Sequence, residues 1–332
     1  MREPKRNDPP ETLLHQLHQA GEAVLFCHVA PDGDTLGSAR ALELLLNQLG
    51  WRTSLAVDGE LPARLGFLPG LTLCRPEEVG MPENAVVIAV DVSSPDRLGK
   101  AEAQYNVAAR RWVIDHHGTN PGFGHINWVE GSAPATAILV NRLYRALGVP
   151  LSREAAICLY TALSTDTGNF VYDSVNDECF EMMAGLMEAG LPLAEISRVL
   201  FREKRADFVR LLGVTLPSLR VTDEGRVAGL CTSLEQFRQN GLDPAETEGV
   251  VDYAIDIQGV RMAYYLHEQE ENVVKGSFRA LPPYRVDQAA RRFGGGGHPQ
   301  AAGFTLRMPI AQAVKEAEAA LHQALEEQNI HE

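Results

Sequence analysis

Residues 23–34 read AVLFCHVAPDGD, and this stretch decides the fold. The apolar run from Ala23 to Val29 is typical of a buried β-strand, and Pro31 and Gly33 predict a turn directly after it. A helical pattern follows the turn. Its leucines recur on one face and are Leu42, Leu45, Leu46 and Leu49. A buried strand followed by an amphipathic helix is the unit from which parallel sheets are built.

The same alternation continues to about residue 190. Further strands are predicted over residues 52–57, 85–90 and 111–114, and helices over 134–147, 153–163 and 178–189. Strands that alternate with helices in this way form parallel sheets with helices on their faces. We therefore expect an α/β domain with a mainly parallel sheet over residues 10–190.

The pattern changes after residue 190. Residues 191–215 are helical in pattern but highly charged, which predicts a helical linker. Beyond it, strands are predicted over residues 218–221, 227–231, 262–266 and 273–279, and Pro309 opens a last amphipathic helix. Residues 216–332 should therefore form a second, smaller domain of mixed α/β structure that binds substrate. We expect the active site in the cleft between the two domains.

Length and composition suit a two-domain globular protein. The chain has 332 residues, of which 45% are hydrophobic and 22% charged. Its five cysteines occur singly, which argues against a disulfide framework and for a reducing compartment. The charged, proline-rich first residues contain no apolar signal segment, and no apolar run approaches the roughly 18 residues needed to cross a membrane. We expect a cytoplasmic protein with no membrane partner.

The overall charge limits the class of substrate. Formal net charge is −14, and no basic stripe runs along the chain. Proteins that hold long nucleic acids usually neutralise many phosphates with lysine and arginine. No stable complex with long nucleic acid is therefore expected. An anionic substrate would have to be short and held locally.

Four segments end in residues that can bind a metal ion. They supply His28, Asp32 and Asp34, then Asp91, then Asp115, His116 and His117, and finally Asp166. Three of the four segments are predicted strands, and the carboxyl ends of parallel strands meet at one edge of a sheet, where ligands bind. We expect residues that are distant in the sequence to converge there.

The residue types indicate two divalent ions. Four of these aspartates, Asp32, Asp34, Asp91 and Asp166, carry a combined charge near −4, and burying them unpaired would cost several kcal/mol. Mixed imidazole and carboxylate ligands suit manganese, iron or zinc better than calcium. An isolated aspartate is more often a helix cap, and Asp-Gly-Asp is more often a turn. If each segment were only a cap or a turn, four coincidences at suitable positions would be needed, so we favour a metal site. Paired ions stabilise both oxygens of an in-line phosphoryl displacement.

A second signal lies in residues 291–304, RRFGGGGHPQAAGF. The glycines Gly294 to Gly297 would expose backbone N–H groups and let a ligand approach closely. His298 follows them, and Arg279 ends a predicted strand upstream and suits bidentate phosphate binding. A glycine run alone is equally consistent with a flexible loop. Beside the histidine and the arginine, we favour an anion cradle.

These motifs resemble a known family. HVAPDGDTLGS, AVDVSSPDR, VIDHH and STDTGNF resemble the four motifs of the DHH phosphoesterase superfamily. GSFRA and GGGGHPQAAG resemble its associated C-terminal domain. The resemblance runs in the same order from about Val24 to Leu306. The two-domain length is most similar to the nanoRNase and pAp-phosphatase branch.

The resemblance implies a role for each motif residue. Asp91 would bridge two metal sites: His28 and Asp32 would complete the first, and the second would be completed by Asp34, His116 and Asp166. His117 would face the scissile phosphate and stabilise it or protonate the leaving oxygen, while Asp115 would orient a neighbouring histidine. The substrate's terminal phosphate or nucleotide would be clamped by Arg279, Gly295, Gly296, Gly297 and His298.

The implied activity is hydrolysis of short RNA or DNA oligonucleotides to nucleoside 5′-monophosphates. Dephosphorylation of 3′-phosphoadenosine 5′-phosphate (pAp) is implied as well. Manganese is the expected ion, with magnesium or cobalt as alternatives, and a homodimer is the base-rate expectation. Three alternatives stay open: a linear or cyclic dinucleotide phosphodiesterase acting on pApA or cyclic di-AMP, an inorganic pyrophosphatase, and a nucleotide-binding regulator without catalysis.

Overall fold

The computed structural model describes residues 8–328. The chain divides into two units, residues 1–203 and 204–332, each with its own sheet. The boundary falls inside the segment predicted as a linker, so the first part of that segment belongs to unit 1 and the rest to unit 2. Most of the charged, proline-rich N-terminal stretch lies outside the described residues, as do the last four residues.

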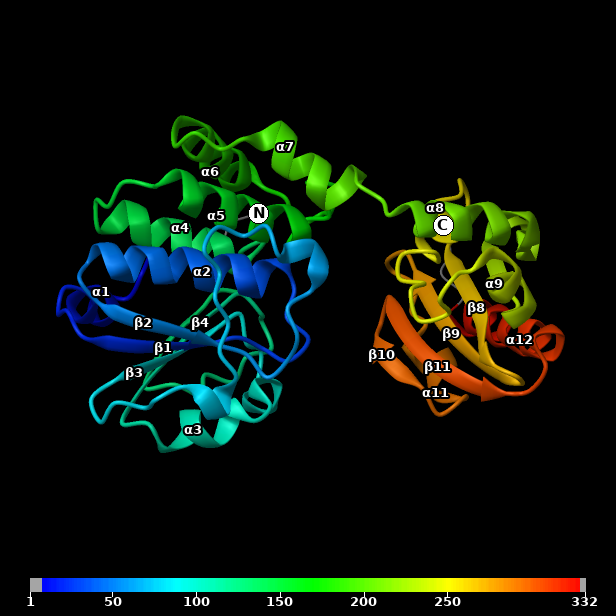
Figure 1. Cartoon of the computed structure of the whole chain (residues 1–332), viewed down its shortest axis with the longest axis horizontal. Helices are drawn as coiled ribbons and strands as arrows, with labels where there is room; N and C mark the ends of the chain where they lie inside the picture. The colour runs from blue at the N-terminus through cyan, green and yellow to red at the C-terminus, as the bar shows by residue number, and fades with distance from the viewer. Residues whose placement is uncertain (1–7, 329–332) are drawn as a thin grey trace. The chain divides into compact units, whose positions relative to one another are not determined.

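Unit 1 is built on a five-stranded parallel sheet with the order β2-β1-β3-β4-β5 (Figure 1). Its strands are β1 (Glu22–Phe26), β2 (Arg52–Ala56), β3 (Val86–Val90), β4 (Arg110–Asp115) and β5 (Ile126–Val129). The predicted α/β domain with a parallel sheet is confirmed. Strand β5 was not predicted, because its four residues are too few to show a periodic pattern.

Helices cover both faces of this sheet. They are α1 (Glu11–Leu17), α2 (Gly33–Gln48), α3 (Ala101–Val107), α4 (Thr136–Ala146), α5 (Arg153–Asp166), α6 (Asp177–Glu188) and α7 (Leu193–Ser197). Strand β3 shows how the two layers divide the core. Val86, Ile88 and Val90 pack with α2, α4 and α5, whereas Val87 and Ala89 pack with α3. A sheet buried on both faces needs continuously apolar strands, which explains the VVIAV sequence of β3.

The start of α2 is pinned against the end of α5. A Cβ atom on Gly33 would lie 2.3 Å from Thr165 Oγ1, and one on Gly37 would lie 2.4 Å from the Cys158 carbonyl oxygen. These two positions therefore require glycine. The turn predicted at Gly33 is wrong: Asp32 caps α2 by accepting a hydrogen bond from the Thr35 N–H at 3.0 Å, and Gly33 is already helical.

The strand order reverses beside β1. The chain passes from β1 to β2 on one side and then returns to β3 on the other side of β1. In open parallel sheets, such a reversal leaves a crevice at the carboxyl ends of the two strands, where ligands bind. The segments that carry His28 and Asp91 follow directly from β1 and β3.

Unit 2 has a six-stranded mixed sheet with the order β10-β11-β9-β8-β7-β6. Its strands are β6 (Arg220–Thr222), β7 (Val227–Thr232), β8 (Met262–Glu270), β9 (Val273–Ala280), β10 (Gly296–His298) and β11 (Ala301–Arg307). Only β7 and β8 pair in parallel. The predicted mixed α/β domain is confirmed, but β10 and β11 were missed. The strand predicted over 218–221 begins later, because residues 216–218 form a 3-10 turn.

The helices of unit 2 pack unequally on the two faces of its sheet. They are α8 (Ala206–Thr215), α9 (Leu234–Asn240), α10 (Asp252–Ile255), α11 (Asp287–Arg291) and α12 (Ile310–Gln328). Helices α11 and α12 share a core with β7, β8, β9 and β11 on one face. On the other face, α8, α9 and α10 share a core with β7 and β8, and α10 also contacts β9. None of the helices within residues 8–328 is long and apolar enough to cross a membrane.

Candidate metal centre

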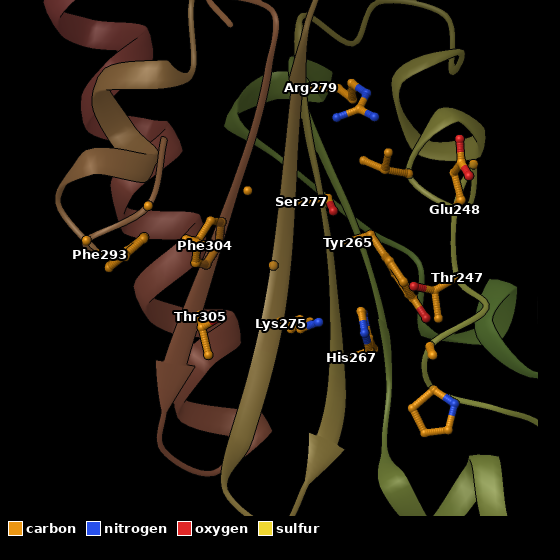
Figure 2. Close-up of a pocket in the computed structure, with 18 residues that line it drawn as sticks. Thr247, Glu248, Tyr265, His267, Lys275, Ser277, Arg279, Phe293, Phe304 and Thr305 are labelled. Carbon is orange, nitrogen blue, oxygen red and sulfur yellow. The ribbon is translucent and has the colours of Figure 1, made fainter. Parts of the chain in front are cut away.

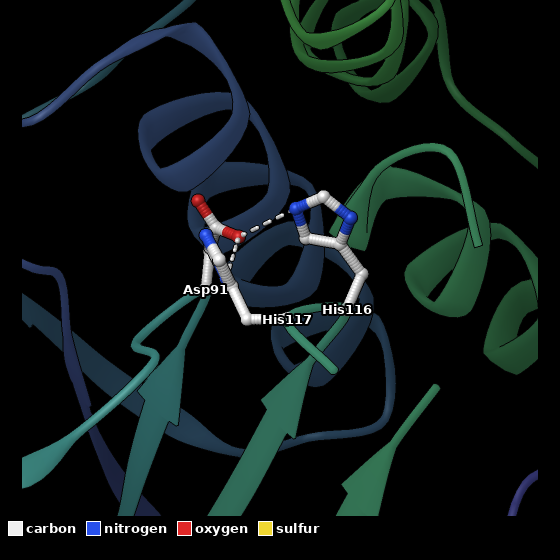
Figure 3. A group of neighbouring side chains, drawn as sticks. All are labelled: Asp91, His116 and His117. Atoms are coloured by element: carbon white, nitrogen blue, oxygen red, sulfur yellow. Dashed lines mark ion pairs between the residues drawn. The ribbon is translucent and has the colours of Figure 1, made fainter. Parts of the chain in front are cut away.

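The histidines and aspartates predicted as ligands meet at one edge of the unit 1 sheet. Asp91 follows the last residue of β3 and has a left-handed backbone with φ of 59°. His116 and His117 follow the end of β4, and Asp166 is the last residue of α5. A left-handed non-glycine residue is uncommon and is concentrated at functional sites. The conformation of Asp91 turns its carboxylate toward the histidines after β4 (Figure 3).

His116 directs one ring nitrogen at three carboxylates. Its Nδ1 donates to the Ala133 carbonyl oxygen, 3.1 Å away, so Nε2 is the nitrogen that is available to a metal ion. The distances from Nε2 are 3.4 Å to Asp166, 3.6 Å to Asp91 and 3.7 Å to Asp34. Carboxylates gathered around one imidazole nitrogen in this way can share a cation with it.

His28 repeats this arrangement on the other side of Asp91. Its Nδ1 donates to the Val29 carbonyl oxygen, 2.7 Å away, so Nε2 is again the nitrogen that is available to a metal ion. Nε2 lies 3.5 Å from an oxygen of Asp32 and 3.8 Å from Asp91 Oδ2. Asp91 thus offers one oxygen to each histidine, Oδ2 toward His28 and Oδ1 toward His116.

Burial makes the cluster electrostatically unfavourable without a cation. Burial, followed by the negative charges of Asp91 and Asp166, raises the pKa of Asp34 well above its usual value. Burial also raises the pKa of Asp91 and of Asp166, and Asp32 adds repulsion to both. Asp32 is the exception: burial raises its pKa, but His28 and the backbone N–H groups of Thr35 and Asp34 together lower it below the usual value.

Supporting contacts hold two of the carboxylates in place. Asp34 accepts hydrogen bonds from the Thr136 N–H at 2.7 Å, the Ala137 N–H at 3.2 Å and the Ser38 hydroxyl at 2.8 Å. Two of these donors are free N–H groups at the start of α4, a position that favours anions. The Thr136 hydroxyl also donates to Asp91 Oδ1 at 2.8 Å. Sequence reasoning missed Thr136, since only the possible helix start at Pro134 marked this segment.

His117 has a different environment from the other two histidines. Its Nδ1 lies 2.8 Å from Asp115 Oδ1, and the buried Asp115 also accepts from the Asn120 side chain at 2.7 Å. The bond to Asp115 raises the pKa of His117 to about 9. His117 Nδ1 is also 3.7 Å from Asp91. A nitrogen that donates to Asp115 has no lone pair for a metal, so we assign His117 no ligand role through Nδ1.

The residues present fit metal binding. Three overlapping groups have potential ligand atoms within 4.8 Å of one another: Asp91 with His116 and His117, His28 with Asp32 and Asp91, and Asp34 with His116 and Asp166. Asp91 belongs to two of these groups. All eight predicted residues, Asp115 included, are brought together in unit 1.

The residues predicted to clamp the substrate lie in unit 2. His298, in β10, pairs with Ala301 in β11, which pairs with Arg279 in β9, so all three form one cross-strand row. The glycines before His298 are not wholly a flexible loop, the alternative to the predicted anion cradle, because β10 begins at Gly296. A Cβ atom on Gly295 would lie 2.2 Å from the Gly303 carbonyl oxygen, so close strand packing requires glycine there.

Comparison with known families agrees with the fold and the motifs. The model of the DHH family, N-terminal domain, matches residues 22–163, and the model of the DHHA1 domain matches residues 227–327. The chain belongs to the DHH family, and the resemblance predicted from the motifs is confirmed.

Individual relatives narrow the comparison. The chain is 32% identical over 302 residues to the bifunctional oligoribonuclease and PAP phosphatase NrnA of Thermus thermophilus, covering 89% of this chain and 88% of that protein. It is 26% identical to the protein of the same name from Bacillus subtilis, over 89% of this chain and 92% of the relative. An exopolyphosphatase-related protein from Bacteroides fragilis has a solved structure with a TM-score of 0.85. That protein is 25% identical, and the match covers 94% of this chain and 95% of the other.

Proposed function

We propose that the chain is a metal-dependent phosphodiesterase that degrades short oligonucleotides to nucleoside 5′-monophosphates and also dephosphorylates pAp. The observation that carries the proposal is the position of Asp91, whose two oxygens face two histidines of the same tautomer. This arrangement supports a shared ligand between two cations. The substrate class is supported by the two relatives named as oligoribonucleases and PAP phosphatases.

The proposed ligands fall into two sets that share Asp91. One set consists of His28, Asp32 and Asp91; the other consists of Asp34, Asp91, His116 and Asp166. Mixed nitrogen and oxygen donors favour manganese, with magnesium or cobalt as alternatives. When bound, such a pair of ions stabilises the attacking and leaving oxygens of an in-line phosphoryl displacement.

His117 is the proposed acid of the reaction. Its side chain is 41% exposed, and its Nδ1 is hydrogen-bonded to Asp115. Asn120 donates to the other oxygen of Asp115 and so fixes the orientation of the pair. Nε2 therefore stays available to donate a proton or a hydrogen bond to an oxygen of the scissile phosphate. A base or acid held by a buried carboxylate in this way is oriented before substrate arrives.

Unit 2 is proposed to hold the far end of the substrate. Arg279 offers a planar guanidinium and His298 an exposed imidazole in the same cross-strand row. Gly296 and Gly297 lie on the edge strand beside them, and Gly295 directly precedes that strand. Both side chains can donate to a terminal phosphate. The location of the active site between the two units, the homodimer and the cellular location stay predictions.

The test is a length series. Purified full-length chain with Mn²⁺ is assayed on 5′-labelled oligonucleotides of two to ten residues, with pAp, pApA and cyclic di-AMP in parallel. We expect turnover of the shortest oligonucleotides and of pAp, and a decline with length. Hydrolysis confined to dinucleotides would favour a dinucleotide phosphodiesterase, and Mn²⁺ binding without any hydrolysis would favour a regulator.

A matched pair of variants ties the activity to the cluster. Asp91→Asn removes the shared charge and should lower turnover at least about a hundredfold. Asp96→Asn makes the same change at an exposed site five residues further along and should leave turnover unchanged. Equal activity in the two variants would remove the cluster from the mechanism.

A further inference from the structure

Part of the unit 2 sheet is open to solvent on one face. Helices α8, α9 and α10 pack on this face mainly over β7 and β8, and α10 also reaches β9 at Arg279, which faces Asp252. The rest of β9, together with β10 and β11, shares no core with these helices. A cavity of about 690 Å³ lies along the uncovered strands (Figure 2). Thr247 and Glu248, from the loop before α10, line its far side. The volume lies within the range of small-molecule and nucleotide sites.

Strand pairing arranges the floor of this cavity in three rows. Residues paired across adjacent strands place their side chains on the same face. The first row contains the proposed clamp: Arg279, which lines the cavity, and His298, which lies in the same row on β10. The middle row runs from Gly296 through Gly303 and Ser277 to the buried Tyr265. The third row consists of Thr305, Lys275 and His267. The middle row therefore carries only small residues on β10, β11 and β9, and hydrogen-bond donors lie on both sides of it.

Lys275 is a cation that the proposed clamp does not use. It is exposed and forms no ion pair with any residue between 8 and 328, whereas Arg279 has Asp252 at 3.7 Å. The two cations are four positions apart on β9, which corresponds to about 13 Å along the strand. The exposed hydroxyl of Thr305 stands beside Lys275 in the same row. A cation and a hydroxyl at the end of a groove suit a phosphate oxygen.

His267 adds no positive charge to the row that contains Lys275. Its ring is buried and stacks on Tyr265 with centroids 5.3 Å apart, and its Nδ1 has no hydrogen-bond partner among the described residues. Burial, and then the charge of Lys275, lower the pKa of His267 to about 4. The imidazole is therefore neutral near pH 7, and Lys275 supplies the positive charge of its row.

We propose that Lys275 and Thr305 form a second phosphate subsite. It binds the next phosphate of an oligonucleotide that is long enough to place an internal phosphate, instead of its terminal one, at Arg279 and His298. The small residues of the middle row, Gly296, Gly303 and Ser277, leave space for the nucleoside between the two phosphates. The inference rests on the proposed function, because it takes an oligonucleotide as the ligand of this cavity.

Counting phosphates gives the length at which the subsite begins to act. One phosphate lies at the metal centre and one at the Arg279 row, so pAp and pApA, with two phosphates each, have none left for Lys275. A 5′-phosphorylated trinucleotide is the shortest substrate with a third. Lys275 should therefore increase affinity for three or more nucleotides and leave pAp and pApA unaffected.

The experiment measures affinity as a function of length in the full chain. Fluorescence anisotropy in the presence of Mn²⁺, with ligands whose linkages resist hydrolysis, gives Kd for pApA and for 5′-phosphorylated tri- and pentaadenylate, at several salt concentrations. Lys275→Gln should weaken binding of the longer ligands about five- to tenfold and that of pApA less than about twofold. The slope of log Kd against log salt should fall by about 0.7 for the pentanucleotide.

Two further variants control the measurement. Lys315→Gln removes the same charge from an exposed position on α12, a helix packed on the opposite face of the sheet, and should not change Kd. Lys275→Arg should retain most of the affinity for long ligands. A wild-type affinity that does not rise from pApA to the trinucleotide, or an equal loss at every length in Lys275→Gln, would overturn the subsite.

The same experiment separates the subsite from the proposed function. If the wild-type chain binds with the expected dependence on length and on Lys275 but hydrolyses no oligonucleotide in Mn²⁺, the subsite stands and the proposed function fails. If turnover is normal but Lys275→Gln binds like the wild type at every length, the proposed function stands and the subsite fails.

Discussion

Asp166→Asn should stabilise the metal-free chain and destabilise the chain when Mn²⁺ is bound. The Asp166 carboxylate lies 3.4 Å from His116 Nε2, and its side chain is one-third exposed. Beyond this contact it has no hydrogen-bond partner among the described residues. Asparagine therefore removes one negative charge from the cluster and leaves no buried donor unsatisfied, which distinguishes this change from one at Asp34.

The magnitude follows from the charges. Like charges about 4 Å apart repel by about 4 kcal/mol at an effective dielectric constant of 20, and partial exposure reduces this to about 0.5–1 kcal/mol. In metal-free buffer, Asp166→Asn should therefore raise Tm of unit 1 by about 1–4 °C. With Mn²⁺ in excess, a 10- to 100-fold loss of affinity removes about 1.4–2.7 kcal/mol of binding stabilisation, or about 3–10 °C.

The sign of the pH dependence is also fixed. Burial raises the pKa of Asp166 in the folded chain, so the folded state holds its proton more tightly than the unfolded state. This contribution to stability is present below the unfolded pKa, about 4, and is lost as pH rises through the folded value. The metal-free wild type should lose stability over this interval, and Asp166→Asn should lose less.

Differential scanning calorimetry at pH 8, with chelator and with Mn²⁺, measures both effects. Asp173→Asn is the control, because it makes the same change on the exposed loop that follows α5. The wild-type and Asp166→Asn values should cross between the two buffers, while Asp173→Asn should follow the wild type in both. A variant that is less stable than the wild type by the same amount in both buffers would refute the electrostatic reasoning.

Three further predictions concern stability away from the metal centre. Gly37→Ala places a Cβ atom 2.4 Å from a backbone carbonyl oxygen and should lower the free energy of unfolding by about 1–3 kcal/mol. Gly185→Ala, on an open helix surface, should raise the free energy of unfolding by up to about 1 kcal/mol. Urea titration of both variants measures the two changes. Because the pKa of His267 is lowered to about 4, unit 2 should lose stability as pH falls from about 6.5 through 4, and His267→Asn should flatten that dependence in pH-resolved thermal melts. Arg142 is buried between Glu130 and Glu178, so Arg142→Ala should cost about 3–5 kcal/mol by denaturant titration, and a milder loss would show that these carboxylates find other partners.

Much of unit 1 could be predicted from local sequence. Its buried strands are apolar runs, and its helices show clear amphipathic periods and glycine stops. The metal cluster was predictable because each ligand follows an element whose end lies at the same sheet edge. His117 and Asp115 could be paired as well, since they are two residues apart at the end of β4.

Other features depend on contacts that no local pattern encodes. The N–H of Thr136 donates to Asp34, which is 102 residues away in the chain. The helix start at Asp32 was hidden because Asp-Gly-Asp is a common turn sequence, and only the packing of Gly33 on Thr165 shows why glycine is there. Strand β10 was hidden for a similar reason: glycine weakens a strand in isolation, and here close pairing with β11 requires it.

The number of Mn²⁺ ions bound per chain tests the central claim most directly. Equilibrium dialysis with metal analysis should give two ions for the wild type, and fewer than two for Asp91→Asn, because that residue belongs to both proposed ligand sets. The Asp96→Asn control should still bind two. A wild-type chain that binds no Mn²⁺, or an Asp91→Asn chain that binds two ions with unchanged affinity, would contradict the account.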